Sequence, residues 1–133
     1  MKLDRILETV LYAHDLVAAE SFYTKVLGLE VESRMAGRHV FFKCGDAMFL
    51  VFNPDKTEIP NPKNLPPVHG SRGAGHVAWV IAYEEVDAWR RRLQEAGVAI
   101  ESENRLGERE HQIYFRDPAG NLLELATPNI GLY

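Results

Sequence analysis

Two stretches of the chain begin in the same way, and this internal repeat limits the possible folds more than any single residue does. The first reads ETVLYA from Glu8, and the second reads HVAWVI from His76. Each is a short apolar strand headed by a possible metal ligand, and each continues through an acidic turn into an amphipathic helix. A glycine, Gly28 in one copy and Gly97 in the other, ends the helix and starts a new strand. A duplicated unit places its opening strands in equivalent positions, so side chains at their heads can converge on one site.

The composition fits one small domain with a single core. The chain has 133 residues, of which 46% are hydrophobic, so we expect residues 1–133 to form one domain built from two half-sized modules. A formal net charge of −4 argues against binding to nucleic acid or to a membrane surface. No apolar run approaches the roughly 18 residues that a membrane span needs, and no signal-peptide stretch follows Met1. The single cysteine, Cys44, suits a reducing compartment, so we expect a cytoplasmic protein.

Hydrophobic periodicity predicts strand, helix and three strands, twice over. Module one covers about 5–53 and module two about 75–128. The linker of about 54–74 contains five of the seven prolines, and we expect an ordered loop there. The expected helices are 16–26 and 84–96, and the expected strands are 6–13, 30–35, 39–43, 47–52, 76–82, 99–103, 110–117 and 121–126.

Two motifs resemble those of a known family. Phe22–Leu29 reads FYTKVLGL and Tyr114–Leu125 reads YFRDPAGNLLEL, and both are similar to signatures of the vicinal oxygen chelate superfamily. This superfamily includes glyoxalase I, fosfomycin-modifying enzymes, extradiol dioxygenases and bleomycin-binding proteins. The resemblance covers nearly the whole chain. It implies an α+β fold in which two tandem βαβββ modules form an open, cupped mixed β-sheet barrel with helices outside and a divalent metal in the cup.

The resemblance also implies a set of metal ligands. The head of the first strand is Glu8, the head of the repeated strand is His76, and the acidic residue of the last motif is Glu124. Glyoxalase I has a fourth, acidic ligand in the strand before the linker. The corresponding stretch here, Met48–Phe52, contains no such residue.

The chemistry of these three residue types can be argued without the family. Two carboxylates and one imidazole suit Mg²⁺, Mn²⁺, Ni²⁺ or Zn²⁺, whereas iron oxygenases favour two histidines and one carboxylate. Burying a lone carboxylate among leucines costs several kcal/mol, so Glu124 is expected to be paired or bound to metal. A carboxylate beside a metal can also carry a proton, and Glu124 and Glu8 are the candidate catalytic residues. For each residue, a surface or packing role is the alternative.

Three further residues are candidates for substrate binding. His111 and Tyr114 lie in the strand next to Glu124, and either side chain could line the cavity. Arg109 could hold an anionic substrate. An exposed histidine, a packed tyrosine and a solvated arginine are the corresponding structural interpretations.

These residues favour a metal-dependent enzyme that acts on a small molecule with vicinal oxygens. The first hypothesis is glyoxalase-I-like isomerisation of the hemithioacetal of a ketoaldehyde and a thiol co-substrate, as in a lactoylglutathione lyase. The alternatives are addition of a thiol or water to an epoxide such as fosfomycin, and metal-free binding of a small ligand, as in bleomycin-resistance proteins. The resemblance further implies a homodimer.

Overall fold

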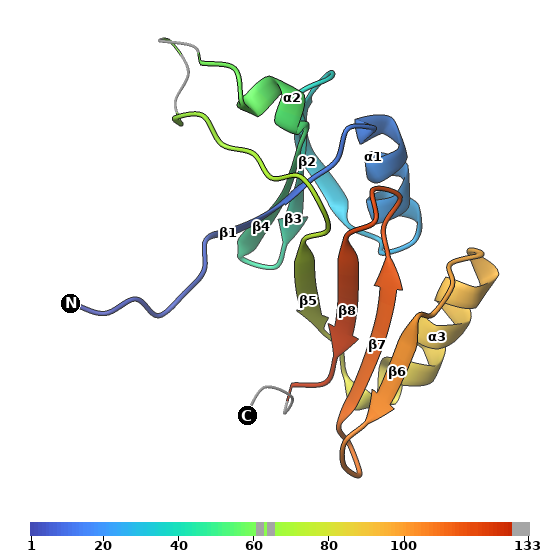
Figure 1. The fold of residues 1–133 in the computed structure, drawn as a ribbon. Coiled ribbons are helices and arrows are strands. Elements are labelled where there is room, and N and C mark those ends of the chain that lie inside the picture. Colours follow the sequence, from blue (N-terminus) through green and yellow to red (C-terminus); the bar gives the residue numbers. More distant parts are fainter. Residues whose placement is uncertain (61–62, 64–65, 129–133) are drawn as a thin grey trace. The chain divides into compact units, whose positions relative to one another are not determined.

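The computed structural model describes residues 1–60, 63 and 66–128, and the chain divides into two compact units, Met1–Gly73 and the chain from Ala74 onward (Figure 1). Each unit holds one open four-stranded mixed sheet with a ten-residue helix. The α+β class and the two tandem βαβββ modules are therefore confirmed.

The first unit follows the predicted order of elements. It consists of β1 (Glu8–Tyr12), α1 (Leu16–Lys25), β2 (Glu30–Met35), β3 (His39–Cys44), β4 (Ala47–Phe52) and the short helix α2 (Pro54–Thr57). The strand order in the sheet is β1-β4-β3-β2. β1 runs parallel to β4, and the other neighbouring pairs are antiparallel. The opening strand therefore lies at the edge of its sheet.

The second unit repeats this topology. It consists of β5 (His76–Val80), the 3₁₀ turn η1 (Tyr83–Glu85), α3 (Val86–Glu95), β6 (Ser102–Arg105), β7 (His111–Arg116) and β8 (Leu122–Ala126). The strand order is β5-β8-β7-β6, with β5 parallel to β8. Figure 1 shows α3 beside β6 and β7. β5 is the edge strand here, as β1 is in the first unit.

Local sequence signals explain how the two long helices begin and end. The Asp15 carboxylate accepts a hydrogen bond from the backbone N–H of Ala18 at 2.9 Å and caps α1. Gly28 and Gly97 follow α1 and α3 with φ angles of 73° and 71°, a left-handed conformation that favours glycine. The predicted glycine stops are confirmed. In the described part of the chain, no helix has both the length and the hydropathy to cross a membrane.

Two elements differ from the prediction. The linker begins with α2, because the Asn53 side chain accepts a hydrogen bond from the Asp55 N–H and caps a helical turn that starts at Pro54. The strand expected at 99–103 lies instead at Ser102–Arg105. Its position follows the register of the hairpin with β7, in which Arg105 pairs with His111, and not the apolar residues that precede it.

The core of the first unit forms around Tyr23 on the inner side of α1. Tyr23 is fully buried, and its ring centroid lies 5.5 Å from that of Phe42 and 4.8 Å from that of Phe49. Both phenylalanines belong to the sheet face that α1 covers. The aromatic residue of the FYTKVLGL motif therefore has a packing role that needs no ligand.

We expect Tyr23→Ala to lower the free energy of unfolding by about 3–5 kcal/mol, because it leaves a cavity among aromatic rings. Urea denaturation measures the loss. Val17→Ala is the matched control on the same helix, because Val17 is 83% exposed and should change stability by no more than about 0.5 kcal/mol. Equal midpoints for the two variants would contradict this account of the core.

Candidate functional site

The open face of the second sheet brings two of the predicted ligands together. Ala78 on β5 pairs with Glu124 on β8, so His76 lies one diagonal step from Glu124 on the same face. The imidazole Nε2 of His76 is 3.2 Å from Oε2 of Glu124. The Glu124 side chain is 9% exposed, whereas that of His76 is 48% exposed. A buried carboxylate is therefore reached from solvent past a partly exposed imidazole.

The other imidazole nitrogen of His76 is also engaged. Nδ1 lies 3.0 Å from the backbone carbonyl oxygen of Leu122, its register partner. A carbonyl oxygen can only accept, so Nδ1 carries a proton and donates it. In the neutral ring Nε2 then presents a lone pair toward the carboxylate of Glu124.

The DPAGN turn positions the strand that carries His76. The Asn121 side chain accepts a hydrogen bond from the Gly75 N–H at 2.8 Å and donates one to Asp117 at 2.9 Å. Asp117 in turn accepts hydrogen bonds from the backbone N–H groups of Ala119 and Asn121. Both Asp117 and Asn121 are buried. This turn ties the residue before His76 to the start of β8.

Tyr114 lies on the same face as the His76–Glu124 pair. It is the direct partner of Glu124 in the β7–β8 ladder. Its ring centroid is 6.4 Å from that of His76, with an interplanar angle of 27°. The half-buried phenol therefore borders the His76–Glu124 pair.

His111 and Arg109 lie away from this face. Three positions separate His111 from Tyr114 along β7, so their side chains point to opposite faces. His111 is buried, with Nε2 2.5 Å from Oε1 of Glu103. Arg109 pairs with Glu84 and stacks on the Tyr83 ring. The structure thus separates His111 and Arg109 from Tyr114, the third candidate for substrate binding.

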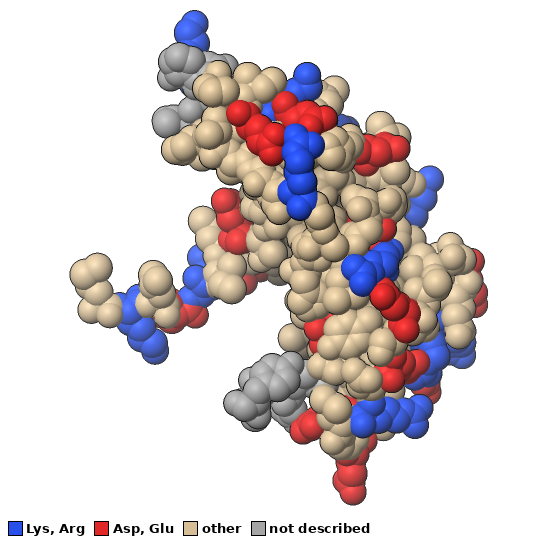
Figure 2. Space-filling model, viewed as in Figure 1, with Lys and Arg blue, Asp and Glu red and all other residues tan. Residues whose placement is uncertain are grey.

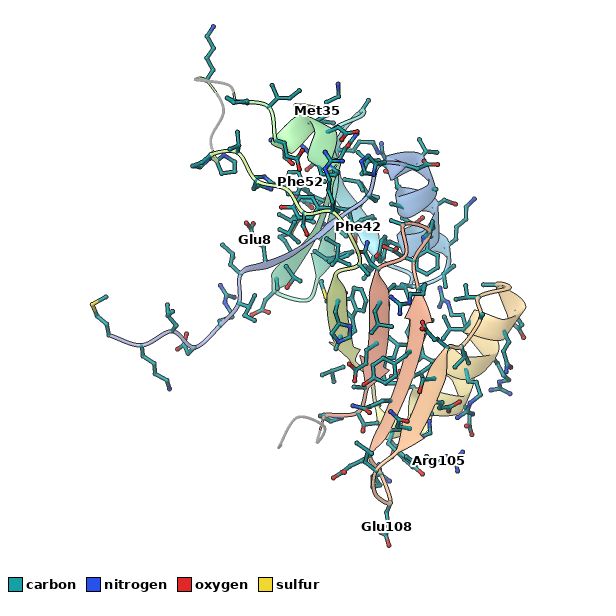
Figure 3. All side chains as sticks on the ribbon, in the orientation of Figure 1. Glu8, Met35, Phe42, Phe52, Arg105 and Glu108 are labelled. Carbon is teal, nitrogen blue, oxygen red and sulfur yellow. The ribbon has the colours of Figure 1, made fainter. Side chains whose placement is uncertain are left out.

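Glu8 lies on the open face of the first sheet and is exposed; Figure 3 labels it at the start of β1. Sequence reasoning missed an aromatic and histidine cluster on this same face. The Tyr12 hydroxyl is 2.7 Å from Nδ1 of His69, and His39 stacks on Phe41 with ring centroids 4.1 Å apart. Burial, and then the Arg38 charge, lower the pKa of His39. Tyr12 and Glu8 are an even number of residues apart in β1, so the sequence pattern already indicated that both side chains lie on this face.

The predicted metal ligands are only partly brought together in the structure. Within residues 1–60, 63 and 66–128, no three or more His, Cys, Asp or Glu side chains gather to hold a metal ion. The described structure brings together one imidazole and one carboxylate, which is two thirds of the predicted set. Nε2 of His76 and a carboxylate oxygen of Glu124 face each other, and the His76 Nδ1–H bond to a carbonyl is the support that metal-binding histidines usually have. The pair fits a metal.

The model of the Glyoxalase/Bleomycin resistance protein/Dioxygenase superfamily matches residues 4–125. The chain belongs to this superfamily. It is similar to the crystal structure of a lactoylglutathione lyase from Agrobacterium tumefaciens, with a TM-score of 0.94 and 37% identity over 100% of both chains.

Two further proteins are similar to this chain. A glutathione transferase FosA from Serratia marcescens is 29% identical over 111 residues, which cover 84% of this chain and 72% of that protein. The fosfomycin resistance protein FosX from Listeria monocytogenes has a TM-score of 0.72 and 22% identity over 97% of both chains, a likeness of fold alone.

Replacing Asn121 tests the role of the DPAGN turn. Asn121→Ala should destabilise the protein by about 2–4 kcal/mol, because the Gly75 N–H and the Asp117 carboxylate each lose a buried partner. Urea denaturation measures the change, and Asn104→Ala, at an exposed asparagine of β6, is the control. An unchanged midpoint for Asn121→Ala would show that the turn does not anchor β5.

The network behind the sheet predicts a pH dependence of stability. Hydrogen bonds from Arg90 and then His111 lower the pKa of Glu103 from 4.5 to about 2. A carboxyl group with a depressed folded-state pKa contributes stability that is complete above 4.5 and is lost as pH falls toward about 2. Glu103→Gln should remove about 1–3 kcal/mol at neutral pH and flatten the stability curve in this window. If the free energies of unfolding of the parent and of Glu103→Gln fell in parallel with pH, Glu103 would not be the source of this pH dependence.

Proposed function

We propose that this chain is a divalent-metal-dependent enzyme that isomerises a small substrate with adjacent oxygen atoms, in the manner of glyoxalase I. The observation that carries the proposal is the pair formed by His76 and Glu124. Nε2 of the imidazole and a carboxylate oxygen lie 3.2 Å apart and face each other. Such a contact is stable when a cation or a proton lies between the two atoms.

His76 and Glu124 would hold the metal, and Glu8, at the head of the equivalent strand in the first unit, is the predicted third ligand. Two carboxylates and one imidazole suit Zn²⁺, Ni²⁺, Mn²⁺ or Mg²⁺. When bound, the metal supplies a Lewis acid that stabilises negative charge on substrate oxygens.

Glu124 is the residue best placed to move a proton. Its carboxylate takes a proton from one substrate carbon and returns it to the neighbouring carbon, so a hemithioacetal becomes a thioester with no atoms gained or lost. Glu8 is the alternative proton carrier. Tyr114, opposite Glu124 in the ladder, is suited to donate its hydroxyl proton in a hydrogen bond to a substrate oxygen.

A thiol co-substrate is part of this proposal. Both the lactoylglutathione lyase and the glutathione transferase FosA that resemble this chain have glutathione in their names. The match to FosA supports a second candidate function, the addition of a thiol or water to an epoxide such as fosfomycin. A metal-free ligand-binding protein is the third, and metal binding separates it from the two enzymes.

A homodimer in the cytoplasm completes the proposal. β1 and β5 each lie at the edge of a sheet, with one row of backbone N–H and C=O groups that the sheet itself does not use. Such edges can pair with a strand of another chain. In addition, β5 exposes apolar surface for a contact, because its Val80 is 73% exposed.

Metal content and two activities test the proposal together. We expect about one metal ion per chain in protein purified without chelators. His76→Ala and Glu124→Gln should each lower metal affinity at least 10- to 100-fold, because each removes a ligand. Elemental analysis measures the metal, and assays with methylglyoxal plus glutathione and with fosfomycin plus glutathione measure the activities.

Glu108→Gln is the matched control, because Glu108 is exposed in the turn between β6 and β7 (Figure 3). It should bind metal as the parent does. Glu8→Gln tests the third ligand in the same way. A parent that takes up no added metal would overturn the enzyme proposal and favour a ligand-binding protein. Metal binding with activity only on fosfomycin would favour the second candidate function.

A further inference from the structure

A concavity lies on the face of the second sheet opposite to the one that carries Glu124. It has a volume of about 380 Å³ and lies among η1, the start of α3, the end of β6 and the start of β7. Arg105 and His111 are register partners on the helix side of the sheet, whereas Tyr114 and Glu124 lie on the other side. The residues that decide its chemistry are Glu84, Asp87, Arg90, Arg105, Arg109 and His111.

Two of the three arginines in this concavity already have carboxylate partners. Arg90 donates from Nε to both carboxylate oxygens of Glu103, at 3.0 and 3.2 Å, and from Nη1 to Asp87 at 2.6 Å. Arg109 pairs with Glu84 while its guanidinium lies 4.7 Å from the centre of the Tyr83 ring. These pairs hold both guanidinium groups in fixed positions.

Arg105 differs from these two. It is the last residue of β6 and its exposed side chain lies next to the turn that carries Glu108 (Figure 3). Among the residues that the structure describes, none forms a hydrogen bond or an ion pair with the guanidinium group of Arg105. Its five N–H donors are therefore available to a ligand in the concavity. The charge of Arg105 adds to those of Arg90 and Arg91 in lowering the pKa of Asp87, a carboxyl group of the same lining. Figure 2 shows acidic and basic side chains intermixed on the visible surface.

We propose that this concavity binds a phosphate group, either as inorganic phosphate or as a small phosphate monoester. The planar guanidinium fork of Arg105 matches two phosphate oxygens, and Arg109 is within the same lining. Glu84 competes for Arg109, so a monoanionic carboxylate ligand gains nothing over the partner already present. A phosphate carries more charge and three acceptor oxygens, and it engages Arg105 and Arg109 together.

The rest of the lining fits a monoester as well as the free ion. The concavity is larger than a phosphate ion, and Tyr83 and Val86 provide apolar surface for an organic remainder. The buried His111 contacts the carboxylate of Glu103, which in turn accepts a hydrogen bond from Arg90. These contacts fix the positions of His111 and Arg90 in the lining without a ligand. Phosphate binding here does not depend on the metal-dependent activity.

Titration of the isotopically labelled protein with inorganic phosphate, followed by amide NMR shifts, tests the proposal. We expect saturable shifts confined to η1, the start of α3 and the turn between β6 and β7. Arg105→Ala should weaken binding at least about tenfold, and Arg105→Lys should weaken it less because it keeps the charge and loses the fork. Glu84→Gln should strengthen binding, since it releases Arg109.

Two controls separate this site from other anion-binding surfaces. Arg91→Ala removes an exposed arginine of α3 outside the concavity and should bind phosphate as the parent does. Glu124→Gln, which disables the proposed metal site, should also leave these shifts unchanged. A parallel titration with glycerol 2-phosphate identifies the source, because the tighter of the two ligands is the form that the site accepts.

Three outcomes would overturn the proposal. One is the absence of saturable shifts at millimolar phosphate. A second is equal weakening by Arg105→Ala and Arg91→Ala, which would indicate a diffuse charge effect. The third is loss of the shifts in Glu124→Gln, which would assign the phosphate to the metal site.

Discussion

The parallel pairing of β5 with β8 determines whether a functional site can form in the second unit. The pairing places His76 beside Leu122 and one diagonal step from Glu124, and the side chains of His76 and Glu124 then lie on one face. A shift of one residue along either strand would send one of them to the opposite face. The hydrogen bonds of Asn121 and Asp117 prevent such a shift, so the most recognisable motif of the chain acts mainly by fixing this register.

Sequence reasoning predicted the fold well because the repeat is a long-range signal. Two copies of strand, helix and three strands allow few topologies, and the elements follow the expected order along the chain. The errors are local. β6 begins later than its apolar residues suggested, since hairpin register determines where pairing starts. Helix α2 was missed because one asparagine cap outweighed the prolines around it.

The candidate site was predictable in its identities and less so in its grouping. His76, Glu124 and Tyr114 share a face as expected, because register partners and alternate residues follow simple rules. His111 was grouped with Tyr114 from its place in the same strand, although an odd separation puts the two side chains on opposite faces. The cluster on the first sheet was missed because it joins residues far apart in the chain, such as Phe52 and His69, although His39 and Phe41 stack as alternate residues of one strand.

The anchoring of His76 has a consequence for how such chains diversify. The residue that fixes β5 at its start is Asn121, which comes 46 positions later in the chain, and not a residue of the loop that leads into β5. Among the residues that the structure describes, those between Thr57 and Gly75 take no part in this anchor of β5. Insertions, deletions and new side chains there can alter recognition while the atoms of His76 and Glu124 that are proposed to hold the metal keep their positions. Selection can thus act on recognition and on chemistry through separate parts of the sequence.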